Sequence, residues 1–193
     1  MVTEFLAKRI TNVFIRRLQI EEEDRDLFYL GIEVIVNTTL TALVILALGI
    51  LLHNFWGAVL FLCCFANIRS YSGGYHARTR LRCFAVSILC YLVSYGMMEG
   101  LLHLGTVTQI IIVTMGILAS LVVFVKYAPV ENPNKRIRDE LLQRNRIMSF
   151  FLLVAWLIAS GFLVLCYKFE FASQIWATTV VIAGLLWVAR RKK

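Results

Sequence analysis

The sequence predicts an all-α integral membrane protein with six transmembrane helices and an N-terminal amphipathic helix at the membrane interface. Of its 193 residues, 60% are hydrophobic, above the roughly 45–50% typical of soluble domains. The mean hydropathy is +0.75, and several apolar runs approach the about 20 residues that a helix needs to cross a bilayer. The basic residues lie between these runs, as membrane topology requires, so we expect no nucleic-acid partner.

The first predicted unit, residues 1–26, joins an amphipathic helix to an acidic linker. Apolar and basic side chains alternate at helical spacing over residues 1–20, which is typical of a helix lying on an anionic membrane surface. A helix packed on the protein itself would show the same pattern, and both interpretations stay open. An acidic run at 21–24 follows, and residues 27–193 form the predicted transmembrane domain.

Six apolar segments within that domain predict the transmembrane helices in order. They cover about residues 30–52, 55–68, 83–104, 107–128, 148–167 and 171–189. The second segment, with about 14 residues, is short enough to tilt little, to thin the bilayer or to be partly re-entrant.

The basic residues between the segments predict how the bundle is oriented. Counted loop by loop, 19 of the 20 Lys and Arg residues fall on alternate sides, with Lys168 as the exception. This distribution predicts that both termini and the loop at 69–83 lie on the cytoplasmic side of the cell membrane. Thiols stay reduced there, and the five cysteines form no Cys-x-x-Cys pair, so we expect no disulfide framework, metal or cofactor.

The loop at 69–83 combines an imidazole, His76, with a thiol, Cys83, at the start of the third apolar segment. A thiol is a nucleophile only as a thiolate, which nearby cations and a helix N-terminus stabilise. Seven residues along one straight helix would separate the two groups by roughly 10.5 Å, too far for a hydrogen bond. We therefore expect the chain to fold back at Gly73–Gly74, whose N–H groups could also bind an oxyanion. An interfacial imidazole and a core thiol are the alternative.

A carboxylate in the first apolar segment, Glu33, is the second candidate for a role at the site. Ionisable groups at that depth are costly and tend to mark function. Glu33 could orient His76 or pair with Arg69; the alternative is an interfacial carboxylate that reaches water.

The stretch G-G-Y-H-A-R-T-R-L-R-C resembles the catalytic segment of accessory gene regulator B (AgrB) peptidases. The matching features are Arg69 at the membrane edge, a glycine before the histidine, His76–Ala77, and Cys83 seven residues after the histidine. K-Y-A-P at 126–129 resembles the family's loop after the fourth span, and the length and the six segments fit as well.

The resemblance implies a membrane cysteine endopeptidase that acts in quorum sensing in Gram-positive bacteria. Its substrate would be an AgrD-like propeptide, whose acidic C-terminal tail is cut off. His76 would be the base and Cys83 the nucleophile, and the resulting thioester would be attacked by a Cys or Ser of the peptide to close a thiolactone or lactone ring. The family also suggests a homodimer.

Basic side chains near this segment are candidates for binding the acidic tail, although anchoring the loops at the inner leaflet explains them as well. They are Arg78, Arg80, Arg82, Lys135, Arg136 and Arg138. A small membrane transporter or peptide exporter without proteolytic activity is the alternative function.

Overall fold

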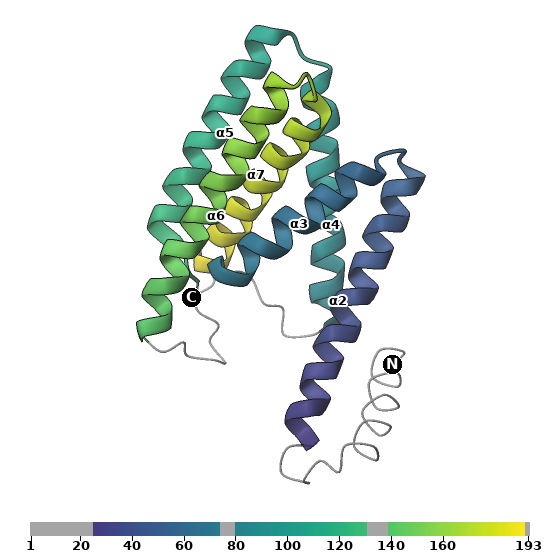
Figure 1. The fold of residues 1–193 in the computed structure, drawn as a ribbon, viewed down its shortest axis with the longest axis vertical. Coiled ribbons are helices and arrows are strands. Elements are labelled where there is room, and N and C mark those ends of the chain that lie inside the picture. The colour runs from purple at the N-terminus through teal and green to yellow at the C-terminus, as the bar shows by residue number, and fades with distance from the viewer. Residues whose placement is uncertain (1–24, 74–79, 131–138, 192–193) are drawn as a thin grey trace.

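The computed structural model describes residues 25–73, 80–130 and 139–191, and these ranges are helical apart from short connections. The helices are α2 (Arg25–Leu51), α3 (Phe55–Ser72), α4 (Arg80–Leu102), α5 (Thr106–Tyr127), α6 (Asp139–Leu165) and α7 (Phe169–Arg191) (Figure 1). The predicted all-α class is confirmed for this part of the chain. The amphipathic helix predicted at 1–26 falls almost entirely outside the described residues.

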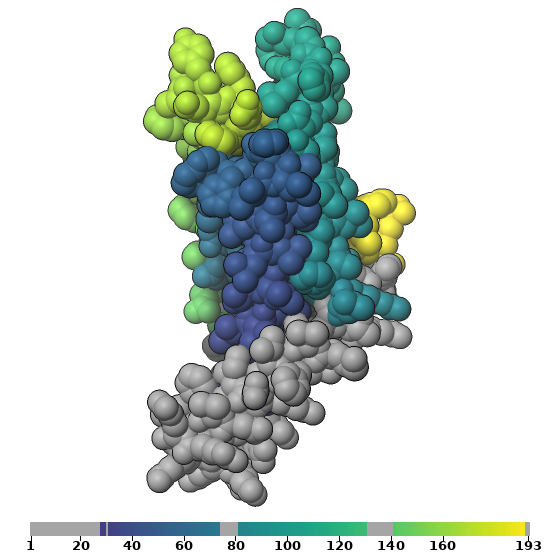
Figure 2. Space-filling view, turned by 90° about the vertical axis from the view of Figure 1, so that its right-hand side faces the viewer, coloured from purple at the N-terminus to yellow at the C-terminus, as the bar shows by residue number. Residues whose placement is uncertain are grey.

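Five of the described helices, α2, α4, α5, α6 and α7, are long and apolar enough to cross a membrane. The shortest is α3, with 18 residues and a length of about 27 Å, and its last turn carries Arg69. The α2–α3 turn accordingly stands lower on the molecule than the α4–α5 and α6–α7 turns (Figures 1 and 2). A sixth full span therefore depends on α3 and stays a prediction.

The predicted loop at 69–83 is wrong in its extent, because both flanking helices continue into it. Helix α3 runs to Ser72, and α4 already begins at Arg80. Within α3, the Ser70 hydroxyl donates to the Ala66 carbonyl at 2.7 Å. Polar residues can thus continue a helix beyond the apolar run that begins it. Hydropathy alone does not predict this extension.

Helix α7 forms the centre of the bundle and packs against α3, α4, α5 and α6 (Figure 1). Buried polar side chains tie it to its neighbours near the α2–α3 turn. Gln174 of α7 donates to the Ser94 hydroxyl of α4 at 2.8 Å and accepts from the Asn54 amide at 3.3 Å. Hydrogen bonds of this kind hold helices together where lipid supplies no hydrophobic force between them.

Successive helices run in alternating directions, so one end of the bundle gathers the starts of α2, α4 and α6 and the ends of α3, α5 and α7 (Figure 1). The basic residues of the described ranges lie at this end, except Lys168, which precedes α7 at the other end. Two segments connect helices at this end: residues 74–79, which include His76 of the predicted catalytic loop, and residues 131–138, which include the predicted tail-binding residues Lys135, Arg136 and Arg138.

Candidate functional site

Cys83 lies in the first turn of α4, on the face that the helix turns toward the bundle. The buried residues of α4 follow helical spacing: Ser87, Cys90, Tyr91, Ser94, Met98 and Leu101. Cys83 precedes Ser87 by four residues and so continues this stripe to the basic end. Its thiol is free and half-buried, whereas the thiols of Cys64 and Cys90 are buried.

The start of α4 favours an anion at this position. The first N–H groups of a helix have no partner within it and carry a partial positive charge. Arg82, which precedes Cys83 in the sequence, has an exposed side chain in the same turn. The Ser87 hydroxyl donates to the Cys83 carbonyl at 3.0 Å. The backbone around the thiol is therefore held in helical geometry, and a thiolate would sit at a helix N-terminus.

A close contact joins the end of α3 to the segment after α5, and we call it the α3–α5 corner (Ser72, Gly73 and Val130). The Val130 N–H donates to the Ser72 carbonyl at 2.9 Å, and Gly73 forms a parallel bridge with Val130. Gly73 has φ +67, and a Cβ there would collide with the Val130 carbonyl oxygen. This position therefore favours glycine for its backbone angle and for space. Its N–H already donates to the Arg69 carbonyl, so an oxyanion would need other donors.

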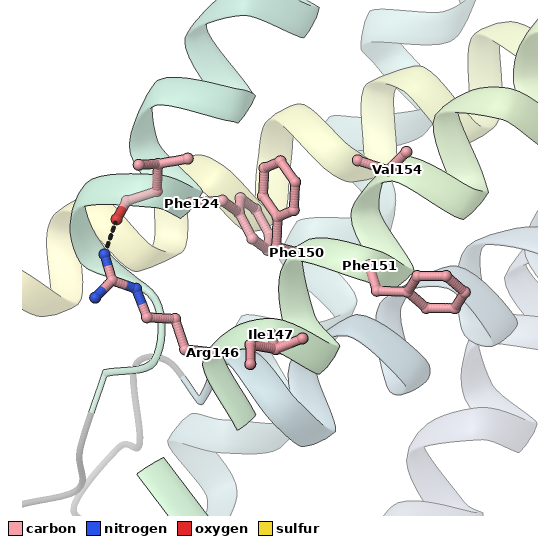
Figure 3. A pocket seen from close by; sticks show the side chains of 7 residues that line it. Phe124, Arg146, Ile147, Phe150, Phe151 and Val154 are labelled. Atoms are coloured by element: carbon pink, nitrogen blue, oxygen red, sulfur yellow. Dashed lines mark hydrogen bonds between the residues drawn. The ribbon is translucent and has the colours of Figure 1, made fainter. Parts of the chain in front are cut away.

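The end of α5 is also fixed by α6. In a continued helix the Val125 carbonyl would accept a hydrogen bond from the N–H of residue 129, but Pro129 has no N–H. Arg146 supplies the missing donor: its Nη2 donates to the Val125 carbonyl at 3.0 Å (Figure 3). Beside this bond, α5 and α6 enclose an apolar groove of about 430 Å³, lined mainly by Phe124, Ile147, Phe150, Phe151 and Val154 (Figure 3).

Glu33 is buried, with 1% of its surface exposed. It occupies the inward stripe of α2 with Thr41 and Ile45, about two turns after the helix begins. The interpretation of Glu33 as a carboxylate reaching water is therefore wrong. Arg69 lies in the last turn of α3, with its guanidinium carbon 5.2 Å from the centre of the Phe65 ring.

Several predicted site residues lie outside the described ranges, so their placement stays a prediction. They are Gly74, His76, Arg78, Lys135, Arg136 and Arg138. Arg80 starts α4, but its side chain is likewise outside the description. Within the described ranges, no three His, Cys, Asp or Glu side chains gather where they could hold a metal ion.

Sequence reasoning missed Ser72, Val130 and Arg146. The proline at 129 carried a usable signal, because it leaves a carbonyl at the end of α5 without its helical donor. Nothing in the local sequence indicated that an arginine of the next helix would fill that position, or that Val130 would meet Gly73.

The family model described as accessory gene regulator B matches residues 7–189 of this chain. The chain belongs to the AgrB family. It is 25% identical over 189 residues to accessory gene regulator protein B of Staphylococcus saprophyticus subsp. saprophyticus, covering 96% of this chain and 94% of that protein. It is 28% identical over 125 residues to the protein of the same name from Staphylococcus intermedius, covering 65% of this chain and 64% of that protein. No solved structure matches this AgrB-family chain.

Proposed function

We propose that this AgrB-family chain is a membrane cysteine endopeptidase that cuts the C-terminal tail from an AgrD-like propeptide in quorum sensing. The observation that carries the proposal is the position of Cys83. Its free, half-buried thiol continues the inward stripe of α4 to the basic end of the bundle. A nucleophile needs this combination of access, a nearby cation and a helix N-terminus.

His76 is the proposed base, and it takes the proton of the Cys83 thiol. The thiolate sulfur attacks the carbonyl carbon at the cut and forms a tetrahedral oxyanion. As this collapses, the C–N bond breaks, the imidazolium gives its proton to the leaving amine, and an acyl-enzyme thioester remains. A thiol or hydroxyl of the peptide then attacks the thioester, closes a thiolactone or lactone ring and releases Cys83. Water must stay out after the cut, because hydrolysis would discard the energy of the thioester.

The basic end suits a substrate with an acidic tail. Arg82, the residue before the proposed nucleophile, is exposed, and Arg144 is exposed on α6 at the same end. Exposed cations attract and orient an anionic segment, with an effect that salt screens. We propose that Arg78, Arg80, Lys135, Arg136 and Arg138 share this role.

A transporter or exporter without proteolytic activity gains less support. Among the side chains that the structure describes, Glu33 is the only buried charged one. The buried amide of Gln174 is occupied by Asn54 and Ser94, and it ties helices together rather than lining an open path. A polar pathway would need more unsatisfied or ionisable groups than this region offers.

The test is co-expression of the chain with the short peptide encoded beside it, with mass spectrometry of the products. Cys83→Ala, Cys83→Ser and His76→Ala should abolish cleavage while the protein still accumulates in the membrane. Serine lacks the thiolate, and without His76 neither the thiol nor the leaving amine has a proton partner.

Alanine at each of the other cysteines provides the matched controls, and processing should persist in all four. These residues are Cys63, Cys64, Cys90 and Cys166. Normal processing by Cys83→Ala would refute the proposal. A product still joined to its tail, but exported, would instead favour the transporter.

A further inference from the structure

We propose that the α3–α5 corner, braced by Arg146, is a positioning element that sets the segment carrying His76 against Cys83. The inference rests on the proposed function and deepens it. It assigns a role to Gly73, Val130 and Arg146 that acts through another residue, since none of them needs to touch the peptide.

The first step is the rigidity of the contact. The Val130 N–H and the Ser72 carbonyl are joined at 2.9 Å, Ser72 is fully buried, and Val130 is 7% exposed. Val130 also belongs to the main hydrophobic cluster of the bundle. A hydrogen bond shielded from water and fixed by core packing has little freedom to shift.

The second step is that the contact is held from three helices. Helix α3 supplies Ser72 and Gly73, α5 leads into Val130, and α6 supplies Arg146, which donates to the Val125 carbonyl at 3.0 Å (Figure 3). Because Pro129 cannot donate to that carbonyl, Arg146 provides the donor that ends α5 in this direction. Loss of the guanidinium would remove this bond and weaken the last turn of α5, from which the chain leads into Val130.

The third step is connectivity. Gly73 is covalently followed by segment 74–79, and Val130 by segment 131–138. Because Gly73 and Val130 are bridged, the predicted catalytic segment and the predicted tail-binding segment depart from one point. The catalytic segment is attached at its other end to α4, three residues before Cys83. A shift of the corner therefore changes the distance that residues 74–79 must cover, and an error of about 1 Å can cost on the order of a hundred-fold in rate.

The experiment follows the reactivity of Cys83 without any peptide. A background with Cys63→Ala and Cys166→Ala leaves Cys83 as the only thiol that is not buried. The rate of alkylation by iodoacetamide is measured against pH in detergent-purified full-length protein. Gly73→Ala should move the alkylation–pH profile to higher pH, toward the profile of His76→Ala, and should lower peptide processing on the order of ten- to a hundred-fold.

The matched control is Gly161→Ala, because a Cβ at Gly161 meets no atom within 4 Å. It should keep the profile and the processing of the parent protein. Arg146→Gln should move the profile in the same direction as Gly73→Ala, and Arg146→Lys should keep part of the parent profile. Arg190→Gln, which removes an exposed cation at the end of α7, should not move it. If the Gly73→Ala protein does not accumulate, the Arg146 variants decide whether the α3–α5 corner has a positioning role.

Two results would overturn the inference, and they are distinguishable. If His76→Ala moves the profile but Gly73→Ala and Arg146→Gln leave both profile and processing unchanged, the corner has no positioning role and the proposed catalytic pair stands. If His76→Ala itself leaves the profile of Cys83 and the processing unchanged, the proposed base is wrong, and the inference falls with it.

Discussion

Glu33 has an environment that a purely structural residue in a membrane span seldom has. It is the only buried charged side chain among those that the structure describes. An ionisable side chain buried within a membrane helix is costly and tends to mark function. Glu33 lies on the inward stripe of α2, so its carboxyl group faces the bundle rather than the lipid. We therefore propose that Glu33 serves the site, either by orienting His76 or by pairing with Arg69.

Replacing this carboxylate should affect the reaction more than the fold. Glu33→Gln keeps the shape and removes the charge, so processing should fall on the order of ten- to a hundred-fold, because the group it orients is displaced. The same change at Glu99, which lies 3.8 Å from His103 at the opposite end of the bundle, should be neutral. Product formation by both variants, measured by mass spectrometry, compares them directly. Equal rates for Glu33→Gln and the parent would assign Glu33 to packing.

The residues of the proposed site differ in how well the sequence predicts them. The chemistry of Cys83 was accessible, because a thiol after a run of arginines at the start of an apolar segment is a local pattern. The burial of Glu33 was not, because it depends on which face α2 turns toward α3 and α4. The contact between Gly73 and Val130 joins residues far apart in the chain, so local pattern carries no trace of it.

Gln174 is the residue through which α7 holds α4 and the start of α3. Its side chain is fully buried, donates to Ser94 and accepts from Asn54. Gln174→Leu keeps a similar volume but removes both hydrogen bonds, while Ser94 keeps its bond to Thr178 and Asn54 its contact with Met98. We therefore expect a loss of about 1–2 kcal/mol in stability. The loss should appear as a lower apparent Tm of the purified protein in detergent.

The control for that change is a glutamine at the edge of the bundle. Gln109 donates to the Leu101 and Leu104 carbonyls, beside the α4–α5 turn, where water can replace a lost bond. Gln109→Leu should therefore cost less than Gln174→Leu. If the two variants have the same apparent Tm, the buried Gln174 amide contributes no more to stability than the Gln109 amide at the edge.

Helices were predictable as elements, but their ends were not. Apolar runs located each described helix, since a run of about 20 apolar residues has few other stable forms in a bilayer. The ends lie in polar sequence, where capping, side-chain hydrogen bonds and tertiary contacts decide. Helix α6 illustrates this: it begins at Asp139, nine residues before the apolar run predicted at 148–167. Its polar first turns bring Arg146 to the end of α5.

The whole molecule is electrically asymmetric along the bundle. Arg69, Arg82 and Arg146 lie at the end that also holds the starts of α2, α4 and α6, whereas Glu99 and Glu170 lie at the other. Cytoplasmic loops carry the excess of Lys and Arg in membrane proteins. We therefore predict that the basic end, with Cys83, faces the cytoplasm. The α2–α3 and α4–α5 turns should then face outward, and α3 should complete a sixth crossing.

Cysteine labelling of intact cells tests this orientation and the role of α3 together. In a background without Cys63, Cys83 and Cys166, single cysteines are introduced at Leu51 or His103, which are exposed. A membrane-impermeant maleimide should reach both from outside, because α3 returns the chain to the basic end before α4 begins.

A cysteine in place of Arg191, at the end of α7, should react only after lysis. Labelling of Arg191→Cys in intact cells would reverse the orientation. Labelling at position 103 without labelling at position 51 would mean that the α2–α3 turn does not reach the outer surface, so that α2 and α3 form a re-entrant hairpin. The length of α3, about 27 Å against a core of about 30 Å, permits this arrangement.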